Sequence, residues 1–341
     1  MARSGEFFST QFPAAASRDS LYLSGSQSKA PTAFIIAQTL AKQGIGLDQP
    51  VAQWWPRAGE LLPASFAETT AAQLLSHRSH GFALEQLQLR RPDQRHLPLA
   101  TPLKPKALAP YLRSYQKAPQ GGPWPFVYSD ISYALLALAI EESLGLSLAE
   151  AMADCLETRA RLEIFLGFSN VPQERQRDVV SGIASVKGRE RVAAPCDLGA
   201  LNPALGLVAS AQGLARLYAH LMANQDWLKT SSAFAQVISP LRDQHRYSLG
   251  LTHFNQGTGN STSYGHVGIY NGCTGATIVC GRSGLTLSLQ LNRINLRTQE
   301  AETYRMIYPA HFLMALRKAI NDPDACAKTL TVTDELLKSL A

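Results

Sequence analysis

The segment Leu21–Lys42, with the sequence LYLSGSQSKAPTAFIIAQTLAK, carries the pattern on which the fold assignment depends. Its first three residues are apolar and indicate a short strand, and the apolar residues after Lys29 recur with helical spacing. Residues i and i+3 share a helix face, so the amine of Lys29 can reach the hydroxyl of Ser26. The free N–H groups of a first helical turn can also stabilise a developing oxyanion. The segment therefore has the layout of an activated nucleophile.

The Ser-x-x-Lys pattern is weak by itself, because the chain contains a second copy at Ser114–Lys117. The second copy lies among prolines with no sustained apolar helix behind it, whereas Ser26 opens a helix that we expect to end near Gly44. Pro31 is compatible with that helix, because a proline in the first turn lacks only an N–H that has no intrahelical partner. We interpret Ser114 as an ordinary surface serine and Ser26 as the candidate nucleophile.

Composition excludes several classes of function. The chain has 341 residues and a formal net charge of +6, enough to bury a large core in one large domain or two interlocked lobes. Its densest basic patch, Arg90 to Arg95, lacks aromatics that would stack on bases, so we expect no nucleic-acid partner. No apolar run is long enough to span a membrane. The cysteines and histidines show no Cys-x-x-Cys or His-Glu-x-x-His pattern, so we expect neither a metal nor a cofactor.

The remaining pattern predicts an α+β protein. Thr70 and Gln73 form a helix-capping pattern, and apolar helices are predicted at 132–144, 147–158, 210–224 and 301–320. Short β-rich runs separated by Gly and Asn predict an antiparallel meander, at 247–254, 263–269, 276–280 and 285–291. We expect a discontinuous α/β lobe (1–48 and 244–341), a mainly helical lobe (49–243), and a site in the cleft between them.

Two further segments carry chemistry. Tyr128-Ser129-Asp130 precedes the second apolar helix, and a phenol near an ammonium group loses its proton more easily and can act as general base, then acid. His266 lies on a predicted strand between glycines that allow close approach of a ligand or another backbone. It can hydrogen-bond a substrate or the tyrosine, and the N–H after Gly268 can be an oxyanion donor. Taken singly, Tyr128 is more simply explained as a tyrosine that anchors a loop onto the core, and His266 as a histidine on a half-exposed strand.

Together, the order and spacing of Ser26-x-x-Lys29, Tyr128-Ser129-Asp130 and His266-Val267-Gly268 resemble the three active-site motifs of the serine β-lactamase and penicillin-binding protein superfamily. The class C branch, with its esterase and D-peptidase relatives, is the most similar. The connecting sequence is similar too, at 47–51, 73–77, 206–210 and 291–293. The resemblance covers residues 17–320 and implies a β-lactamase/transpeptidase-like fold, in which an antiparallel sheet is flanked by helices and carries an inserted helical lobe.

The resemblance also implies roles for individual residues. Ser26 would be the acyl-accepting nucleophile, Lys29 its partner base, and Tyr128 the group that carries the proton to and from the leaving group. The backbone N–H groups of Ser26 and Ile269 would form the oxyanion hole. Substrate contacts would come from the second and third motifs, at Asp130, His266, Val267 and Gly268. The implied reaction is two-step acyl transfer through an acyl-enzyme, with no metal or cofactor.

The chain departs from the family at positions that bear on its substrate. The second motif usually ends in Asn, and the charge of Asp130 would favour the ammonium form of Lys29 and shift the work of the base to Tyr128. Val267 lacks the hydroxyl that the third motif commonly offers to a carboxylate, and His266 stands where many members carry lysine. We therefore expect a small ester, thioester or amide substrate, ahead of a β-lactam or a D-Ala-D-Ala peptide. Hydrolysis and transacylation remain open, as does a degenerate, non-catalytic binding protein.

Ser26 also lies closer to the N-terminus than is usual for the family, whose longer N-terminal segment supplies a helix and two strands of the central sheet. We expect these strands to be shortened or missing. The exposed sheet edge would then be covered by a homo-oligomer contact or by another segment. The N-terminus leads into no apolar signal core, which favours a cytoplasmic location unless a leader precedes this chain.

Overall fold

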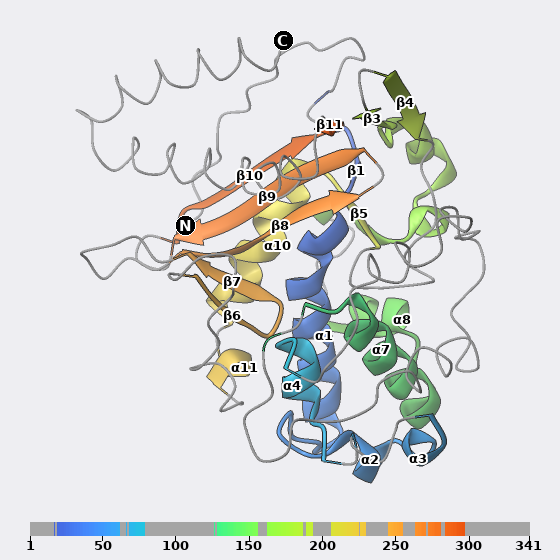
Figure 1. Ribbon diagram of the computed structural model, residues 1–341, viewed down its shortest axis with the longest axis vertical. Coiled ribbons are helices and arrows are strands. Elements are labelled where there is room, and N and C mark those ends of the chain that lie inside the picture. Colours follow the sequence, from blue (N-terminus) through green and yellow to red (C-terminus); the bar gives the residue numbers. More distant parts are fainter. Residues whose placement is uncertain are drawn as a thin grey trace.

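The computed structural model describes residues 17, 19–61, 66, 68–78, 126, 128–155, 162–186, 189–193, 206–224, 226–229, 245–254, 263–270, 272–280 and 284–296. These residues form an α+β arrangement of helices packed against antiparallel strands (Figure 1). Four sequence-based expectations lie outside the described residues. They concern the Ser114 copy of the motif, the Arg90–Arg95 patch, the segment before Ser17 and the helix at 301–320.

A five-stranded antiparallel sheet in the order β10-β9-β8-β7-β6 is the largest of the described sheets. Its strands are β6 (His245–Ser248), β7 (Leu251–Phe254), β8 (Ser263–Tyr270), β9 (Cys273–Cys280) and β10 (Thr286–Leu291). The predicted meander is therefore confirmed, but the single run predicted at 247–254 is wrong. Leu249 and Gly250 both have positive φ, 47° and 80°, which is the backbone of a tight hairpin turn, so the run divides into β6 and β7.

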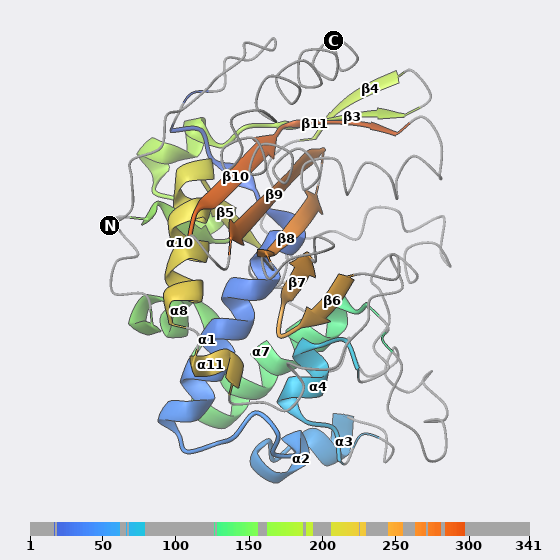
Figure 2. The same ribbon diagram turned by 90° about the vertical axis from the view of Figure 1, so that its left-hand side faces the viewer.

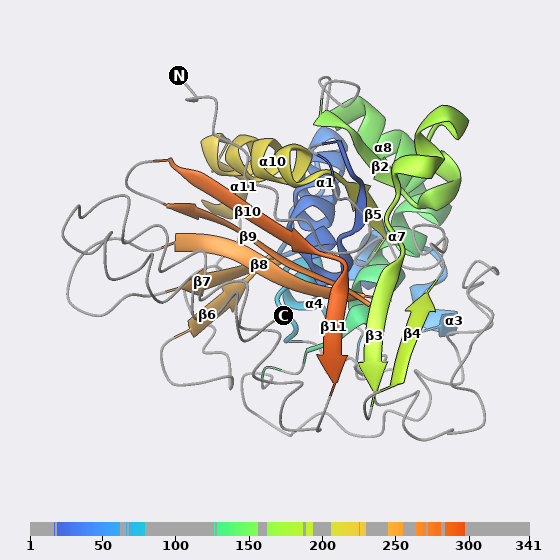
Figure 3. The ribbon, with the colours of Figure 1, turned by 90° about the horizontal axis from the view of Figure 1, so that it is seen from above.

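Helices α1 (Lys29–Lys42) and α10 (Ala211–Ala223) lie side by side on the same face of this sheet (Figures 2 and 3). Helix α7 (Asp130–Leu144) packs against α1, and α4 (Ala71–Leu75) packs against α7. The remaining described α-helices are α2 (Val51–Trp54), α3 (Ala58–Leu61), α8 (Leu148–Cys155) and α11 (Asp226–Lys229). None of the helices that the structure describes is both long and apolar enough to cross a membrane.

The helix boundaries follow from capping side chains that the sequence displays. Thr70 accepts a hydrogen bond from the Gln73 N–H, and the Gln73 side chain accepts one from the Thr70 N–H, which is the predicted capping box. Ser129 and Ser210 cap α7 and α10 in the same position through their hydroxyls. Gly145, with φ of 63°, ends α7.

The remaining described strands form two smaller sheets. Strand β1 (Tyr22–Leu23) pairs with β5 (Leu207–Ala209), which pairs with β2 (Ile164–Leu166). The other sheet has the order β11-β3-β4 and consists of β3 (Gly182–Val186), β4 (Arg189–Ala193) and β11 (Arg293–Leu296). Two short 3-10 helices, η4 (Phe168–Asn170) and η5 (Gln173–Asp178), follow β2.

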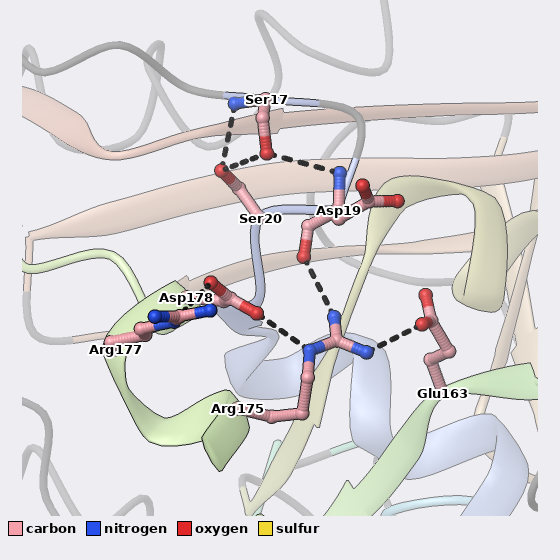
Figure 4. A network of polar contacts seen from close by, with 7 residues as sticks. All are labelled: Ser17, Asp19, Ser20, Glu163, Arg175, Arg177 and Asp178. Carbon is pink, nitrogen blue, oxygen red and sulfur yellow. Dashed lines mark hydrogen bonds and ion pairs between the residues drawn. The ribbon is translucent and has the colours of Figure 1, made fainter.

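An arginine-centred network holds the chain just before β1 (Figure 4). The Arg175 guanidinium donates to Glu163 and Asp178, each at 2.6 Å, and to the Asp19 carbonyl at 3.1 Å. The side chains are partly exposed, so each ion pair contributes little by itself. Their joint effect is to fix the path of the chain into the strand that leads to Ser26.

Helix α1 lies in the centre of the main hydrophobic core. Its residues from Lys29 to Ala37 are all buried, and most of them are apolar. Trp55, Tyr133 and Tyr218, which are among the largest fully buried side chains, belong to the same cluster. The helix that directly follows the candidate nucleophile is thus surrounded by the rest of the fold.

Two glycines let backbones approach the segment from Ser24 to the start of α1 more closely than any side chain would allow. A Cβ at Gly268 of β8 would lie 2.1 Å from the Ser24 carbonyl oxygen. A Cβ at Gly250 would lie 2.5 Å from the Lys29 carbonyl oxygen. The β6–β7 turn is therefore pressed against the start of α1, and β8 against the backbone of Ser24. These two contacts set the distance between the sheet and Ser26.

We expect Gly250→Ala to destabilise the protein more than Gly44→Ala. Both glycines have positive φ, 80° and 71°, but nothing lies within 4 Å of a Cβ built at Gly44. The Gly44 substitution should cost about 1–2 kcal/mol from the left-handed backbone alone. The Gly250 substitution should cost roughly 1–3 kcal/mol more, because the methyl group collides with the Lys29 carbonyl. Urea unfolding of the two variants measures this difference, and equal losses would contradict the close packing.

Candidate active site

The candidate nucleophile lies in a short 3-10 helix, η1 (Gly25–Ser28), that runs directly into α1 at Lys29. The Lys29 Nζ donates to the Ser26 Oγ at 3.1 Å, so the amine reaches the hydroxyl as the helical spacing predicts. The Lys29 side chain is fully buried. A lysine in the core with its ammonium at a serine hydroxyl is unusual, because an ordinary lysine keeps its charge in water.

The residue after Ser26 ties η1 to the sheet. The carboxamides of Gln27 and Gln290 donate to one another, both at 3.0 Å, and the Thr277 hydroxyl donates to the Gln27 Oε1 at 2.8 Å. The Tyr218 hydroxyl donates to the Gln27 carbonyl at 2.7 Å. The Ser28 hydroxyl accepts from a backbone N–H of β5. Sequence reasoning assigned no role to Gln27 or Ser28, and their only signal was a polar residue inside the motif.

Asp130 forms an ion pair with Lys29 from the first turn of α7. Both side chains are buried, and a carboxylate at this distance stabilises the ammonium form of the lysine. The Lys29 Nζ also lies 4.7 Å from the centroid of the half-buried Tyr128 ring, in cation–π geometry. Residues that the sequence placed in two separate motifs therefore share one cation.

Strand β8 brings the third motif to the same place. Gly25 has φ of 53°, and a Cβ there would lie 2.8 Å from the Ile269 carbonyl oxygen, so this part of β8 runs against η1. His266 and Val267 alternate across the strand. Val267 packs against an apolar cluster that includes Phe254, whereas His266 is buried among polar and aromatic groups. The two side chains consequently have different surroundings.

His266 is hydrogen-bonded to a tyrosine of strand β6, and its ring also lies near that of Tyr128. Its Nε2 lies 3.2 Å from the hydroxyl of Tyr247 in β6, while the centroids of its ring and the Tyr128 ring are 6.4 Å apart. Tyr247 is in turn 3.1 Å from the Nε2 of His77, whose Nδ1 accepts from the Ser129 N–H at 3.0 Å. Tyr247 carried no recognisable signal in the sequence, and His77 appeared only within a stretch similar to the family.

These buried groups are electrically neutral at pH 7. Burial, with the Lys29 charge as a further cause, lowers the pKa of His266 to about 3. The same two causes, followed by the nearby His266, lower the pKa of His77 well below its usual value of 6.5. Burial raises the pKa of the Tyr247 phenol well above 10. His266 therefore offers hydrogen-bonding atoms at the site but no positive charge.

The described geometry is suited to proton transfer at a serine hydroxyl. A hydroxyl, an ammonium group, a carboxylate and a phenol ring converge within hydrogen-bonding or ring-contact distance. The backbone of Ile269 runs alongside η1, where an oxyanion donor is expected.

Several solved structures have a fold similar to that of this protein. Among solved structures, the chain is similar to a D-stereospecific amidohydrolase from Streptomyces sp., with a TM-score of 0.64, 21% identity, and coverage of 81% of this chain and 83% of that one. It is similar to the D-amino acid amidase from Ochrobactrum anthropi SV3, with a TM-score of 0.65, 17% identity, and coverage of 94% and 86%. It is also similar to the octameric penicillin-binding protein homologue from Pyrococcus abyssi, with a TM-score of 0.62, 21% identity, and coverage of 82% and 63%.

At these identities the structural likeness establishes the β-lactamase/transpeptidase-like fold that the sequence predicted. Comparison with curated protein sequences gives no match. The family described as Beta-lactamase, however, matches residues 3–307, which is most of the chain. This protein therefore belongs to the beta-lactamase family.

Proposed function

We propose that this protein is a serine hydrolase that forms a covalent acyl-enzyme on Ser26 and cleaves a small amide or ester. The observation that carries the proposal is the contact of the Ser26 hydroxyl with a fully buried lysine ammonium, which is itself paired with Asp130. Burying a charged lysine costs free energy that an ordinary core residue would not require. Such an arrangement is typical of a site whose chemistry needs the charge.

In the proposed reaction, the Ser26 Oγ attacks the substrate carbonyl carbon, and Tyr128 accepts the hydroxyl proton. Because Asp130 favours the ammonium form of Lys29, this lysine acts as a cation that helps Tyr128 to lose its own proton. The backbone N–H groups of Ser26 and Ile269 would hold the oxyanion. Collapse of the intermediate breaks the bond to the amine or alcohol, which takes the proton from Tyr128. Water then attacks the acyl-enzyme by the same route.

The charges of the site favour an uncharged acyl group. The Lys29 ammonium is already paired with Asp130, and His266 is neutral, so neither is suited to bind a substrate carboxylate. Val267 adds no hydroxyl. We therefore rank a neutral amide, ester or thioester above a β-lactam or a D-Ala-D-Ala peptide. The printed names of two similar structures, an amidohydrolase and a D-amino acid amidase, make an amide the first substrate class to test.

The alternative is a non-catalytic member that binds a ligand at the same place. Asp130 supports this alternative. Its carboxylate is paired with Lys29, and the pairing makes Lys29 a weaker base toward Ser26. The division into two lobes, the site between them and the coverage of the sheet edge by a second copy also remain proposals.

Ser26→Ala should abolish covalent labelling by a fluorophosphonate probe. The probe phosphorylates an activated serine, so intact-protein mass spectrometry should show one adduct on the wild type and none on the variant. Ser114→Ala is the matched control, because it removes the serine of the second Ser-x-x-Lys copy and should leave the adduct in place. A wild-type protein that takes no adduct from this probe or from activated esters would support the binding protein instead.

Tyr128→Phe should slow acyl transfer to Ser26 by about a hundredfold or more, the usual contribution of a general acid–base group. The ring and its contact with Lys29 remain, so the loss reports the hydroxyl. The control is Tyr264→Phe on β8, whose ring packs edge-on against His253 with centroids 5.0 Å apart. The rate of activated-ester hydrolysis measures both, and wild-type turnover by Tyr128→Phe would refute its role.

Asp130→Asn should move the acid limb of the rate–pH profile to lower pH. Removing the carboxylate makes the site more positive, so either Lys29 or Tyr128 loses a proton more easily. Asp154→Asn is a matched control, because Asp154 pairs with Lys42 at the other end of α1, where both side chains are more than half exposed, 62% and 52%. It should leave the profile unchanged. Coincident profiles for Asp130→Asn and the wild type would show that the ion pair does not control the proton transfer.

A further inference from the structure

His77 occupies a backbone position that ordinarily belongs to glycine. It follows the end of α4 with φ of 56°, its N–H donates to the Leu74 carbonyl, and the Arg78 N–H donates to the Gln73 carbonyl at 2.8 Å. This is the Schellman pattern of helix termination, in which a left-handed glycine avoids a steric cost of about 1–2 kcal/mol. A fully buried histidine in this position indicates that the imidazole has a use that outweighs the strain.

The hydrogen bonds of this imidazole have a direction that its surroundings determine. The Ser129 N–H can only donate, so the His77 Nδ1 carries no proton and its Nε2–H donates to the Tyr247 oxygen. At the other end, the Val267 carbonyl can only accept, so the His266 Nδ1 is protonated and its Nε2 accepts the Tyr247 proton. The four contacts form one chain from Ser129 to Val267 that fixes the tautomer of each histidine, and the Tyr247 hydroxyl at its centre also hydrogen-bonds the Tyr133 hydroxyl.

This chain joins parts of the site that are remote in sequence. Ser129 stands between Tyr128 and Asp130, while Val267 precedes the glycine that runs against η1. The His77 ring also packs on the Tyr128 ring, with centroids 4.3 Å apart and planes inclined by 37°. The Tyr128 ring thus has His77 and the Lys29 ammonium as close neighbours.

We propose that His77 and Tyr247 are positioning residues, which connect the Tyr128-Ser129-Asp130 segment to strand β8 and hold the Tyr128 phenol in register with Ser26. Neither residue is assigned contact with the substrate. The catalytic consequence rests on the proposed function, whereas the hydrogen-bonded chain itself can be tested without it.

The tautomers of the two histidines test the chain directly. Imidazole ¹⁵N NMR of the wild-type protein between pH 5.5 and 8 should show both rings neutral, with the proton of His77 on Nε2 and that of His266 on Nδ1. The charged group that acts on both rings is Lys29, which is paired with Asp130, and the tyrosines around the rings are Tyr128, Tyr133 and Tyr247. A charged ring at pH 7, or the opposite tautomer of either histidine, would overturn the chain.

Tyr247→Phe tests what the chain does. It keeps the ring and removes the hydroxyl that both histidines share, so the maximal rate of fluorophosphonate labelling should fall about tenfold, equal to about 1.4 kcal/mol of barrier. The probe concentration that gives half-maximal rate should not change, because the chain is not expected to contact the probe. Ser248→Ala is the control: it removes a buried hydroxyl, 2.9 Å from the His253 Nε2, at the next residue of β6. It should lower stability comparably and leave labelling unchanged.

His77→Gly separates positioning from helix termination. Glycine is the favoured residue at this backbone position, so a role limited to ending α4 predicts labelling at the wild-type rate. A positioning role predicts a loss of tenfold or more at a temperature well below the unfolding midpoint. Wild-type labelling by both Tyr247→Phe and His77→Gly would overturn the proposal. A wild-type protein with the stated tautomers but no label would refute the proposed function, and with it the catalytic role of the chain, while the chain itself would stand.

Discussion

The buried ammonium of Lys29 is the interaction on which the arrangement of the site depends. A charge that is removed from water costs several kcal/mol unless an opposite charge and hydrogen bonds accompany it. Asp130 supplies the charge, Ser26 supplies a hydroxyl, and the Tyr128 ring covers the cation from a third direction. Because Lys29 begins α1, and Asp130 and Tyr128 lie at the start of α7, the two helices can pack in this register with little freedom to slide.

The same cation determines the chemistry of its neighbours. Burial and the positive charge of Lys29 together keep His77 and His266 neutral, and a neutral imidazole has one donor and one acceptor rather than two donors. Only in this state can each histidine accept from one neighbour and donate to the next. The electrostatics of the ion pair and the direction of the hydrogen bonds are therefore parts of a single arrangement, which reaches from Ser129 to β8.

Backbone packing makes this arrangement rigid. Gly25, Gly250 and Gly268 bring η1, the β6–β7 turn and β8 into direct contact, and in each case a Cβ would collide with a backbone oxygen. The paired amides of Gln27 and Gln290 add hydrogen bonds across the same contact. A nucleophile on a segment held in this way loses little further entropy on reaching its reactive geometry, which is a recognised source of rate enhancement.

Much of the fold could be predicted from the sequence, because the patterns that indicate its helices and strands are local. The cap of α4, the ends of α1 and α7, and the strands of the meander depend on residues within a few positions of one another, and the structure confirms them. The split of 247–254 into a hairpin was missed, because apolar residues continue through the Leu249-Gly250 turn and hide it. The three motifs could be proposed as one site because their order and spacing resemble those of a family to which the chain belongs.

What only the tertiary structure decided is which side chains meet: Asp130 with Lys29, Gln27 with Gln290, and Tyr247 with two histidines. Such contacts join residues tens to hundreds of positions apart, and they form only when the burial of α1 brings the sheet and the helices together around it.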